Sequence, residues 1–396
     1  MRHRVAHVIT RLVVGGAQEN TIASAVGLQA KGDWDVSLIS GPTLGPEGSL
    51  EDRMPGTGVD FHVATGLVRN VSPADEARAF VWLWRHFREQ SPTIVHTHSA
   101  KAGILGRLAA RMARVPIIIH SLHGPSFGDF QGAAANVLYK NAERLAGRVT
   151  DHYISVADAM SQRHLSAGIG NPEDYTRVFS GFDIDPYLRL SPEPQGRERW
   201  GLGKDDFVIA KVARMFQLKG HDDLFDIAPD LVRRIPNAKF LLIGGGEWEA
   251  KFRQRAQDLD LEDRFVFTGL VPPESIPELL GASDVLVHLS YREGLPRALP
   301  QAMAAARPMV AYDNDGAPEV CRPGETGELA PCGDALSALE GLCRIAADRP
   351  RARAMGVAGR EFVRERFSIT NLVDQQNAVY RQLLQRKGIS PTPETA

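Results

Sequence analysis

Short apolar runs alternate with amphipathic stretches along the first 180 residues. The runs rich in β-branched residues, which predict strands, lie at 4–10, 34–40, 59–63, 93–96, 116–120 and 152–156. Stretches with helical periodicity lie between them, at 15–30, 73–90, 101–114 and 131–148, and a segment rich in Gly and Pro at 41–58 predicts a loop. Strand–helix alternation of this kind predicts a parallel sheet covered by helices on both faces.

A second alternating series follows a segment at 180–197 that carries three prolines and little periodicity. We therefore predict an N-terminal domain at 1–180, a linker at 181–197 and a C-terminal domain at 198–366. The last part, 367–396, is expected to be a helix that crosses back to the N-terminal domain and ends in a frayed tail. The expected strands of the second series are 207–213, 238–243, 264–267 and 284–289, and the expected helices are 221–234, 247–259, 273–281, 297–306, 334–347, 351–366 and 371–386.

The predicted fold class is therefore α/β, with two doubly wound, Rossmann-like domains. Such domains bind ligands at the carboxyl ends of their strands. We expect the two ligand-binding edges to face each other across the linker, on either side of a central cleft.

Composition excludes several classes of protein. The chain has 396 residues, 43% hydrophobic and 24% charged, which is typical of a soluble globular protein. Its net charge of −2 gives no sign of nucleic-acid binding. Three cysteines without a CxxC motif indicate reduced thiols. The N-terminus shows no signal-peptide pattern, and apolar runs such as 115–119 are too short to span a bilayer. We expect a cytoplasmic protein, with any membrane contact peripheral at the inner face.

The strongest candidate for chemistry is the segment 290–319, SYREGLPRALPQAMAAARPMVAYDNDGAPE. It places the carboxylate of Glu293 on a tight loop directly before an Ala-rich helix. Pro300 fits in the first turn of that helix, where backbone N–H groups have no partner to lose. The remaining free N–H groups and the helix dipole predict an anion site beside Glu293. Such a site suits a diphosphate attached to a hydroxyl-rich group.

Several further motifs stand in order along the chain. They are Gly15-Gly16-Ala17-Gln18, the segment HTHSAKAGILGRLAARMA from His96, His123-Gly124, Ser180-Gly181-Phe182-Asp183, Arg214 with Lys219-Gly220, Gly244-Gly245-Gly246, Thr268-Gly269, the Glu293 loop and Gly316-Ala317-Pro318-Glu319. Each is weak alone, but their order and spacing resemble the retaining GT-B glycosyltransferases, specifically glycosyltransferase family 4. The resemblance covers most of the chain.

The resemblance implies roles for particular residues. The expected catalytic residues are His123, Glu293, Arg214 and Lys219, with Arg214 and Lys219 neutralising the leaving diphosphate and Glu293 bonding to the donor sugar. The expected donor-binding residues are Gly15, Gly16, Gly244, Thr268, Gly269, Gly294, Leu295, Pro296, Gln301 and Glu319. Two plainer interpretations stay open: His123 packed at a strand end, and Gly15-Gly16 as an ordinary strand–helix turn.

Gln301 departs from the family pattern, in which a second glutamate after seven intervening residues holds the ribose hydroxyls. Glutamine keeps a carbonyl acceptor but loses the charge. Because a charge-assisted hydrogen bond is worth roughly 1.5–3 kcal/mol against about 1 for a neutral one, the expected cost is about tenfold to thirtyfold in donor affinity.

No metal or other cofactor is expected. His96 and His98 form an HxH pair without a carboxylate or Cys partner at metal spacing, so we interpret them as structural polar residues. Asp313 and Asp315 resemble a metal-binding DxD motif, but a turn is the better interpretation. The sequence therefore predicts no obligatory divalent ion.

Two sets of basic residues have helical spacing in the first domain. Arg107, Arg111 and Arg114 form the first, and Lys140, Arg144 and Arg148 form the second, with Val137, Leu138 and Leu145 nearby. This pattern fits either contact with an anionic membrane surface or ordinary solvated helix faces.

The leading hypothesis is a retaining glycosyltransferase of hexosyltransferase type. Its expected partners are a nucleotide sugar as donor, a sugar or lipid-linked sugar as acceptor, and an anionic membrane surface, with no nucleic acid. The expected process is assembly of cell-surface polysaccharide or lipopolysaccharide. Two alternatives stay open: a sugar-nucleotide epimerase on the same frame, and a weakly active donor-binding subunit.

Overall fold

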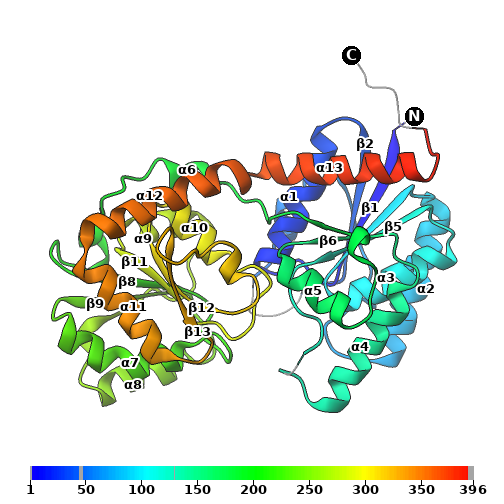
Figure 1. Cartoon of the computed structure of the whole chain (residues 1–396). Helices are drawn as coiled ribbons and strands as arrows, with labels where there is room; N and C mark the ends of the chain where they lie inside the picture. Colours follow the sequence, from blue (N-terminus) through cyan, green and yellow to red (C-terminus); the bar gives the residue numbers. More distant parts are fainter. Residues whose placement is uncertain (1, 44–47, 129, 391–396) are drawn as a thin grey trace. The chain divides into compact units, whose positions relative to one another are not determined.

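The computed structural model describes residues 2–43, 48–128 and 130–390, which form two compact units (Figure 1). The first unit contains Met1–Phe182 and Ile369–Ala396, and the second contains Asp183–Ser368. Each unit is built on one parallel sheet and is described by itself. The predicted frayed tail falls mostly on 391–396, outside the described residues.

The sheet of the first unit has seven parallel strands in the order β3-β2-β1-β4-β5-β6-β7. The order reverses direction between β1 and β4, which is the switch point of this sheet. The strands are β1 (His3–Ile9), β2 (Trp34–Ser40), β3 (Asp60–Val63), β4 (Ile94–His98), β5 (Ile117–Leu122), β6 (His152–Ser155) and β7 (Tyr175–Arg177).

Helices cover both faces of this sheet and bury its central strands, β1, β2, β4, β5 and β6. Helices α1 and α13 pack on one face in a core that includes Leu28 and Leu372, and α2 and α3 pack on the other with Leu83 and Ala109. The helices are α1 (Gly16–Ala30), α2 (Pro73–Gln90), α3 (Ala100–Met112), α4 (Ala133–Gly147), α5 (Asp158–Ser166) and α13 (Ile369–Arg386).

Helix α13, which runs along the top of the first unit in Figure 1, joins that unit although it comes last in the chain. The Trp34 indole N–H donates to the Asn377 side chain over 2.8 Å. At Gly27 the two helices approach so closely that a Cβ would lie 2.3 Å from the Val373 side chain. Glycine is therefore needed where α1 and α13 cross.

The second unit has a six-stranded parallel sheet in the order β10-β9-β8-β11-β12-β13, with its switch point between β8 and β11. Its strands are β8 (Phe207–Val212), β9 (Ala238–Ile243), β10 (Phe265–Phe267), β11 (Val285–His288), β12 (Met309–Asp313) and β13 (Gly327–Pro331). Its helices are α6 (Asp185–Leu188), α7 (His221–Arg234), α8 (Glu249–Asp258), α9 (Ile276–Gly281), α10 (Ala298–Ala304), α11 (Ala335–Ala347) and α12 (Arg349–Arg366).

Two features of this unit differ from the sequence-based expectation. The boundary between the units falls at Phe182, and residues 183–197 belong to the second unit instead of forming a separate linker. Tyr187 in this segment is buried, and the buried Arg307 guanidinium donates to the carbonyl of Ser191. These contacts are made by side chains distant in sequence, so the Pro-rich pattern did not reveal them.

Strands β12 and β13 were not predicted, although β12 is buried over four of its five residues. Both have only five residues, and β13 follows a turn with Pro323 and Gly324, so neither gives a long alternating pattern. Among the helices in the described part of the chain, none combines the length and apolar character needed to cross a bilayer.

Candidate active site

The predicted site residues lie at the carboxyl ends of strands in their own units. In the second unit Arg214 follows β8, Gly244 follows β9, Thr268 follows β10, Glu293 follows β11 and Glu319 follows β12. Carboxyl ends of parallel strands meet at one edge of a sheet, so these five residues gather at the same edge. In the first unit Gly15 and Gly16 follow β1 and begin α1, and His123 follows β5.

Lys219 and Glu293 form an ion pair at the switch point of the second sheet. The Lys219 ammonium contacts the Glu293 carboxylate, and the side chains keep 19% and 24% of their surface exposed. The pair therefore remains accessible to a ligand. Ser290 also donates its hydroxyl to the same carboxylate oxygen over 3.1 Å.

Backbone and side-chain contacts fix the loop that carries Glu293. The Glu293 N–H donates to the Asp315 carboxylate over 2.8 Å. The N–H of Gly316 donates to the Gly294 carbonyl over 2.9 Å, which joins this loop to the one carrying Glu319. Asp315 lies in a turn with φ of 49°, and its carboxylate stabilises the Glu293 loop, in agreement with the turn interpretation of the DND motif.

The surroundings of Glu293 favour its ionised form. Burial alone would raise the pKa of this carboxyl group, but the charge of Lys219 and the hydrogen bonds from Lys219 and Ser290 outweigh it, so the pKa lies below its usual value of 4.5. His288 lies 3.9 Å from the same carboxylate, and burial lowers its pKa to about 3. At neutral pH the site therefore presents a carboxylate beside an ammonium and a neutral imidazole.

Arg214 and Lys219 share one aromatic side chain. The Arg214 guanidinium carbon lies 5.0 Å from the centre of the Phe216 ring, and the Lys219 nitrogen lies 5.7 Å from it. Cation–π contacts at these distances hold long side chains in place without neutralising them. The sheet thus brings Arg214, Lys219 and Glu293 together, although Glu293 is 74 residues from Lys219 in sequence.

The loop between Arg214 and Lys219 is held in a restricted conformation. Leu218 has φ of 70°, its carbonyl accepts a hydrogen bond from the Tyr291 N–H at 2.9 Å, and the Ser290 hydroxyl oxygen lies 3.0 Å from the same carbonyl. Gly220 has φ of 64°, and a Cβ there would lie 1.8 Å from the Leu289 carbonyl oxygen. Only glycine fits this contact, which holds the backbone after Lys219 against Leu289.

The helix after Pro296 provides fewer free N–H groups than the sequence suggested. Helix α10 has only seven residues. Leu299 already donates its N–H to the Pro296 carbonyl over 3.2 Å, and Pro300 has no N–H. Two of the first three positions of the helix are therefore unavailable to an anion. Leu295 precedes this helix on the Glu293 loop.

Gln301 lies on α10 and is partly buried. Its amide donates to the Tyr187 hydroxyl over 2.9 Å. Tyr187 belongs to the segment first interpreted as a linker, so no sequence signal pointed to this partner.

The residues expected near the nucleotide base are joined by backbone contacts. Gly244 donates its N–H to the Gly269 carbonyl over 3.2 Å, and Thr268 donates its hydroxyl to the same carbonyl over 3.0 Å. Gly244 has φ of 130°, and a Cβ there would lie 2.4 Å from the Ala213 carbonyl oxygen. This close approach places the ends of β9 and β10 against the start of the Arg214 loop.

His123 is the end of a hydrogen-bonded group of buried histidines in the first unit. Its Nε2 lies 2.9 Å from His98 Nδ1, and His98 Nε2 lies 2.9 Å from His7 Nδ1. Burial lowers the pKa of His123 to about 4, so the ring is neutral at pH 7. His7, His96 and His98 have ligand atoms within 4.8 Å of one another and form the group among the described residues that could hold a metal ion.

Lys211 is a site neighbour that the sequence did not mark. It lies on β8 and is almost fully buried, and its ammonium has no hydrogen-bond partner among the described residues. Burial lowers the pKa of Lys211 to about 7. The charge of Asp223 opposes this shift, and the charge of Lys219 adds to it. Asp223 in turn accepts hydrogen bonds from the hydroxyls of Tyr291, at 2.7 Å, and Tyr312. The sequence signal that could have identified this residue is a lysine inside the apolar run 207–213.

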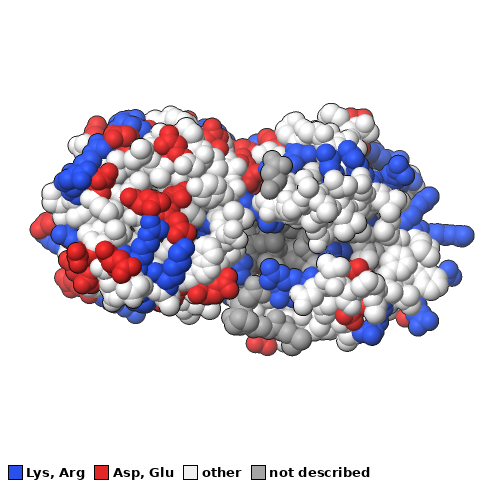
Figure 2. Space-filling view, turned by 90° about the horizontal axis from the view of Figure 1, so that it is seen from below, with Lys and Arg blue, Asp and Glu red and all other residues white. Residues whose placement is uncertain are grey.

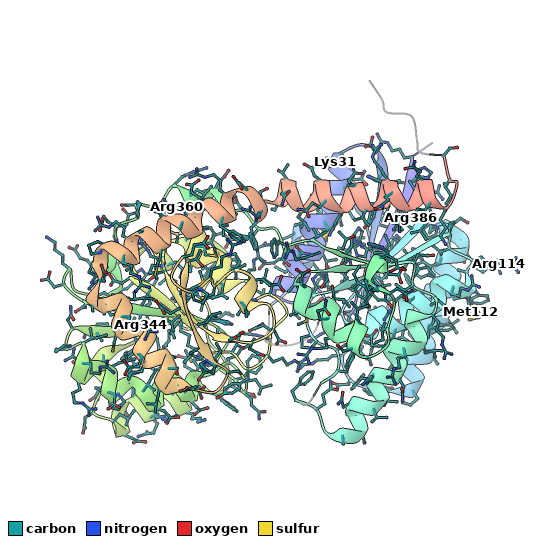
Figure 3. The ribbon with its side chains drawn as sticks, in the orientation of Figure 1. Lys31, Met112, Arg114, Arg344, Arg360 and Arg386 are labelled. Atoms are coloured by element: carbon teal, nitrogen blue, oxygen red, sulfur yellow. The ribbon has the colours of Figure 1, made fainter. Side chains whose placement is uncertain are left out.

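Fewer residues of the two basic sets in the first unit lie free at the surface than the sequence suggested. Arg107 is buried and donates to the buried Glu143 carboxylate over 2.6 Å. Arg144 donates to the Ala167 carbonyl over 2.8 Å. Arg107 thus departs from the predicted stripe because α3 and α4 pack together there. Met112 and Arg114 lie at the outer end of α3 (Figure 3), and lysines and arginines outnumber acidic residues on the face of this unit seen in Figure 2.

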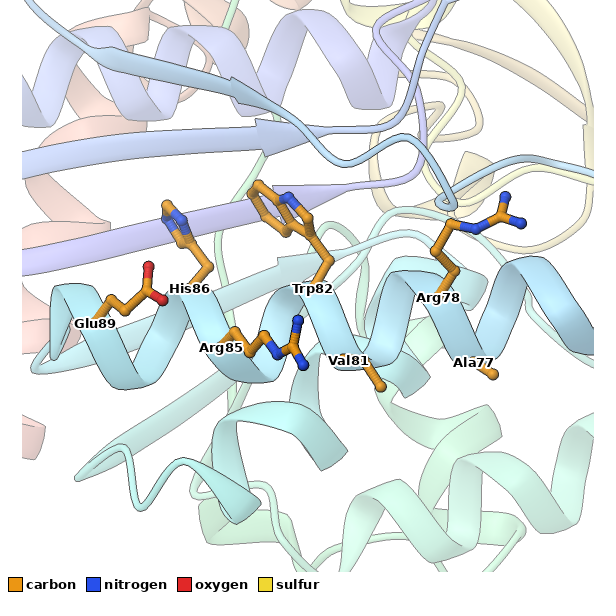
Figure 4. Close-up of a pocket in the computed structure, with 7 residues that line it drawn as sticks. All are labelled: Ala77, Arg78, Val81, Trp82, Arg85, His86 and Glu89. Carbon is orange, nitrogen blue, oxygen red and sulfur yellow. The ribbon is translucent and has the colours of Figure 1, made fainter.

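A surface hollow lies away from these residues, along the outer side of α2 (Figure 4). Ala77, Arg78, Val81, Trp82, Arg85, His86 and Glu89 line it, all from one helix. Trp82 and His86 stack with ring centres 4.8 Å apart. A hollow lined by one helix offers no converging polar groups, so it is not the candidate site.

Comparison with known proteins agrees with the fold. Residues 193–362 match the family described as "Glycosyl transferases group 1", and residues 15–180 match "Glycosyl transferase 4-like domain". Two parallel-sheet units of this kind are the architecture of the GT-B glycosyltransferases. The chain belongs to the group 1 glycosyltransferases of family 4, as the resemblance in its motifs predicted.

Similar proteins span most of the chain. A UDP-Gal:alpha-D-GlcNAc-diphosphoundecaprenol alpha-1,3-galactosyltransferase of Escherichia coli is 26% identical over 97% of this chain and 98% of its own. A GDP-mannose-dependent alpha-(1-6)-phosphatidylinositol monomannoside mannosyltransferase of Mycolicibacterium smegmatis is 32% identical over 67% of this chain and 69% of its own. The crystal structure of Anabaena Alr3699/HepE in complex with UDP-glucose has a TM-score of 0.80 at 20% identity, covering 96% of this chain and 99% of that chain.

Proposed function

We propose that this glycosyltransferase moves a sugar from a nucleoside diphosphate sugar to a hydroxyl acceptor, with retention of configuration at the anomeric carbon. The observation that carries the proposal is the Lys219–Glu293 ion pair beside Arg214 at the switch point of the second sheet. The names of the relatives, which include UDP- and GDP-linked sugars, support the donor class.

In the proposed reaction the two cations stabilise the leaving group. The bond between the anomeric carbon and the diphosphate oxygen breaks, and negative charge grows on the diphosphate. Arg214 and Lys219 are the cations available to stabilise that charge. The acceptor oxygen bonds to the anomeric carbon on the same face of the sugar, and its proton passes to the departing diphosphate oxygen.

Glu293 suits the role of hydrogen-bond acceptor for donor-sugar hydroxyls. Its pKa lies below the usual value because Lys219 and Ser290 outweigh the effect of burial, so it stays ionised through neutral pH. His123, with a neutral ring, suits a contact with a sugar hydroxyl.

The test is acceptor-dependent release of free nucleoside diphosphate by the purified chain. A thermal-shift screen of nucleotide sugars first identifies the donor, because selective binding raises the stability of the folded state. NMR of the product then gives its anomeric configuration. Transfer with inversion would contradict the retaining proposal, and interconversion of the donor without acceptor would favour an epimerase.

Matched variants separate the site from general stability. Glu293→Gln is expected to lower kcat/KM about a hundredfold, since an ionised acceptor in a preorganised site is lost. Glu340→Gln removes an exposed carboxylate that pairs with Arg234 in the same unit and should leave kcat/KM unchanged. Equal effects of the two variants would refute the role of Glu293. Measurable turnover by the wild type would reject the donor-binding subunit.

The proposed reaction needs no divalent ion, since Arg214 and Lys219 supply positive charge beside the carboxylate. Turnover should be unchanged by a chelator such as EDTA. A loss that Mg²⁺ or Mn²⁺ restores would contradict this part of the proposal.

We also propose peripheral contact between the first unit and an anionic membrane, as part of cell-surface polysaccharide or lipopolysaccharide assembly on a lipid-linked acceptor. Val137, Leu138 and Leu145 on α4 are exposed, and Arg111 and Arg114 border a hollow at the end of α3. Exposed apolar side chains and arginines on the same unit suit the headgroup region of an anionic leaflet.

Flotation with vesicles that contain phosphatidylglycerol tests this contact. Leu138→Glu should abolish salt-sensitive binding. Leu336→Glu is the matched control, because Leu336 in the second unit is exposed to 65% against 66% for Leu138. Absence of wild-type binding at low salt would end the membrane proposal and leave the transfer proposal intact.

A further inference from the structure

A chain of hydrogen-bonded side chains runs from His123 to the C-terminal helix. From His123 it passes through His98 and His7, with each imidazole pair 2.9 Å apart. His7 Nε2 then lies 3.5 Å from the Tyr380 hydroxyl on α13. The same hydroxyl lies 2.5 Å from His96 Nδ1, and His96 Nε2 lies 2.7 Å from the Ser121 hydroxyl.

This chain occupies both ring nitrogens of His7, His96 and His98. His123 differs, because its Nδ1 is buried and has no hydrogen-bond partner among the described residues. Nδ1 of His123 is thus the one ring nitrogen of these four histidines that lacks a partner among the described residues, and it lies at the carboxyl edge of the first sheet, where a ligand would bind.

All members of the chain are neutral at pH 7. Burial lowers the pKa of His7 to about 3 and that of His123 to about 4, and it holds those of His96 and His98 well below the usual range. Burial also raises the pKa of Tyr380, which therefore keeps its proton. Each neutral imidazole has one donor and one acceptor nitrogen, so all the donors in the chain must point the same way.

The two contacts of Tyr380 select the direction. Its O–H can donate to His96 Nδ1 or to His7 Nε2, and the separations of 2.5 Å and 3.5 Å favour His96 as the acceptor. If Tyr380 donates to His96 Nδ1, its oxygen accepts from His7 Nε2–H. His7 Nδ1 then accepts from His98 Nε2–H, and His98 Nδ1 accepts from His123 Nε2–H.

We propose that Tyr380, acting through His7 and His98, holds His123 as the Nε2–H tautomer and so leaves Nδ1 as a fixed hydrogen-bond acceptor. Tyr380, His7 and His98 are positioning residues in this arrangement. The proposal rests on the proposed transfer only for its consequence, that Nδ1 accepts a hydrogen bond from a substrate hydroxyl. It gives the buried polar chain a role that apolar residues in the same place could not have.

A metal ion bound by His7, His96 and His98 is the competing interpretation of the cluster. It would require ring nitrogens to leave hydrogen bonds that already satisfy them. The hydrogen-bonded chain needs no such change, and it links the three residues to His123 as well.

The test is ¹⁵N NMR of the histidine rings in the full chain at pH 7 without ligand, with His123 assigned by its missing signal in His123→Gln. The wild type should show one His123 tautomer, with the proton on Nε2. Tyr380→Phe removes the phenol that sets the direction and should give a mixture of both tautomers. Tyr175→Phe is the matched control, since it removes a hydroxyl that donates to the Ile169 carbonyl over 2.7 Å in the same unit.

Three results would overturn the proposal. They are a wild-type His123 protonated on Nδ1, an unchanged tautomer in Tyr380→Phe, and stoichiometric zinc in the purified protein that binds to the three histidines. The wild-type spectrum decides the first even if the variant fails to fold. Because no donor or acceptor is present, failure here is separate from failure of the proposed transfer, which the turnover assay reports.

Discussion

Replacing Lys211 with methionine should stabilise the second unit, and more strongly at pH 7 than at pH 9. Lys211 is 1% exposed, and its ammonium has no hydrogen-bond partner among the described residues. Methionine has a similar length and no charge, so it fills the same space on β8 without the cost of burying an ammonium ion.

The pKa of Lys211 sets the magnitude and sign. Burial lowers it from 10.5 to about 7 in the folded state. Between these values the unfolded state binds more protons than the folded state, so stability of the wild type rises with pH. With about 1.4 kcal/mol for each unit of pKa, the penalty is about 4 kcal/mol at pH 7 and about 2 kcal/mol at pH 9. The methionine side chain does not titrate, so the variant has neither penalty.

Hydrogen exchange measured by mass spectrometry isolates the effect, because peptides from β8 and β9 report on the second unit alone. The gain in opening free energy of Lys211→Met over wild type should shrink by about 2 kcal/mol between pH 7 and pH 9. Lys239→Met on β9 is the control, since the Lys239 ammonium is exposed and donates to the Asp263 carbonyl. A gain that does not change with pH, or a destabilised variant at both values, would refute the reasoning.

Three other substitutions have clear expected outcomes. Gln301→Glu should bind the donor nucleotide about tenfold to thirtyfold more tightly in a titration, and unchanged affinity would remove ribose contact from the argument. Glu143→Gln should cost about 3–5 kcal/mol in a thermal or urea unfolding experiment because it leaves the buried Arg107 unpaired, and a loss below about 1 kcal/mol would contradict burial of that pair. Gly220→Ala should lower the free energy of unfolding far more than Gly269→Ala. The two glycines have similar φ values of 64° and 66°, but only at Gly220 would a Cβ meet a backbone oxygen. Similar losses in the two variants would show that this contact relaxes.

Periodicity and motif order were enough to predict the α/β class and the family. Each signal is local, because a strand followed by a turn and a helix leaves its pattern within about 30 residues. The same local logic identified Arg214, Lys219 and Glu293 as residues that follow strands, and the structure joins Lys219 to Glu293. Strands β12 and β13 were missed because each has only five residues, too few for a clear alternating pattern.

Tertiary structure alone decided which polar groups are buried and which partners they have. Lys211 is a buried ammonium, Arg107 has left the basic stripe for Glu143, and Gln301 bonds to Tyr187 from a segment expected to be a linker. The contact from His96 to Tyr380 joins residues 284 positions apart. Sequence spacing fixes only which side of a strand or helix a residue occupies. Its environment depends on the element that packs against that side, and that element comes from distant parts of the chain.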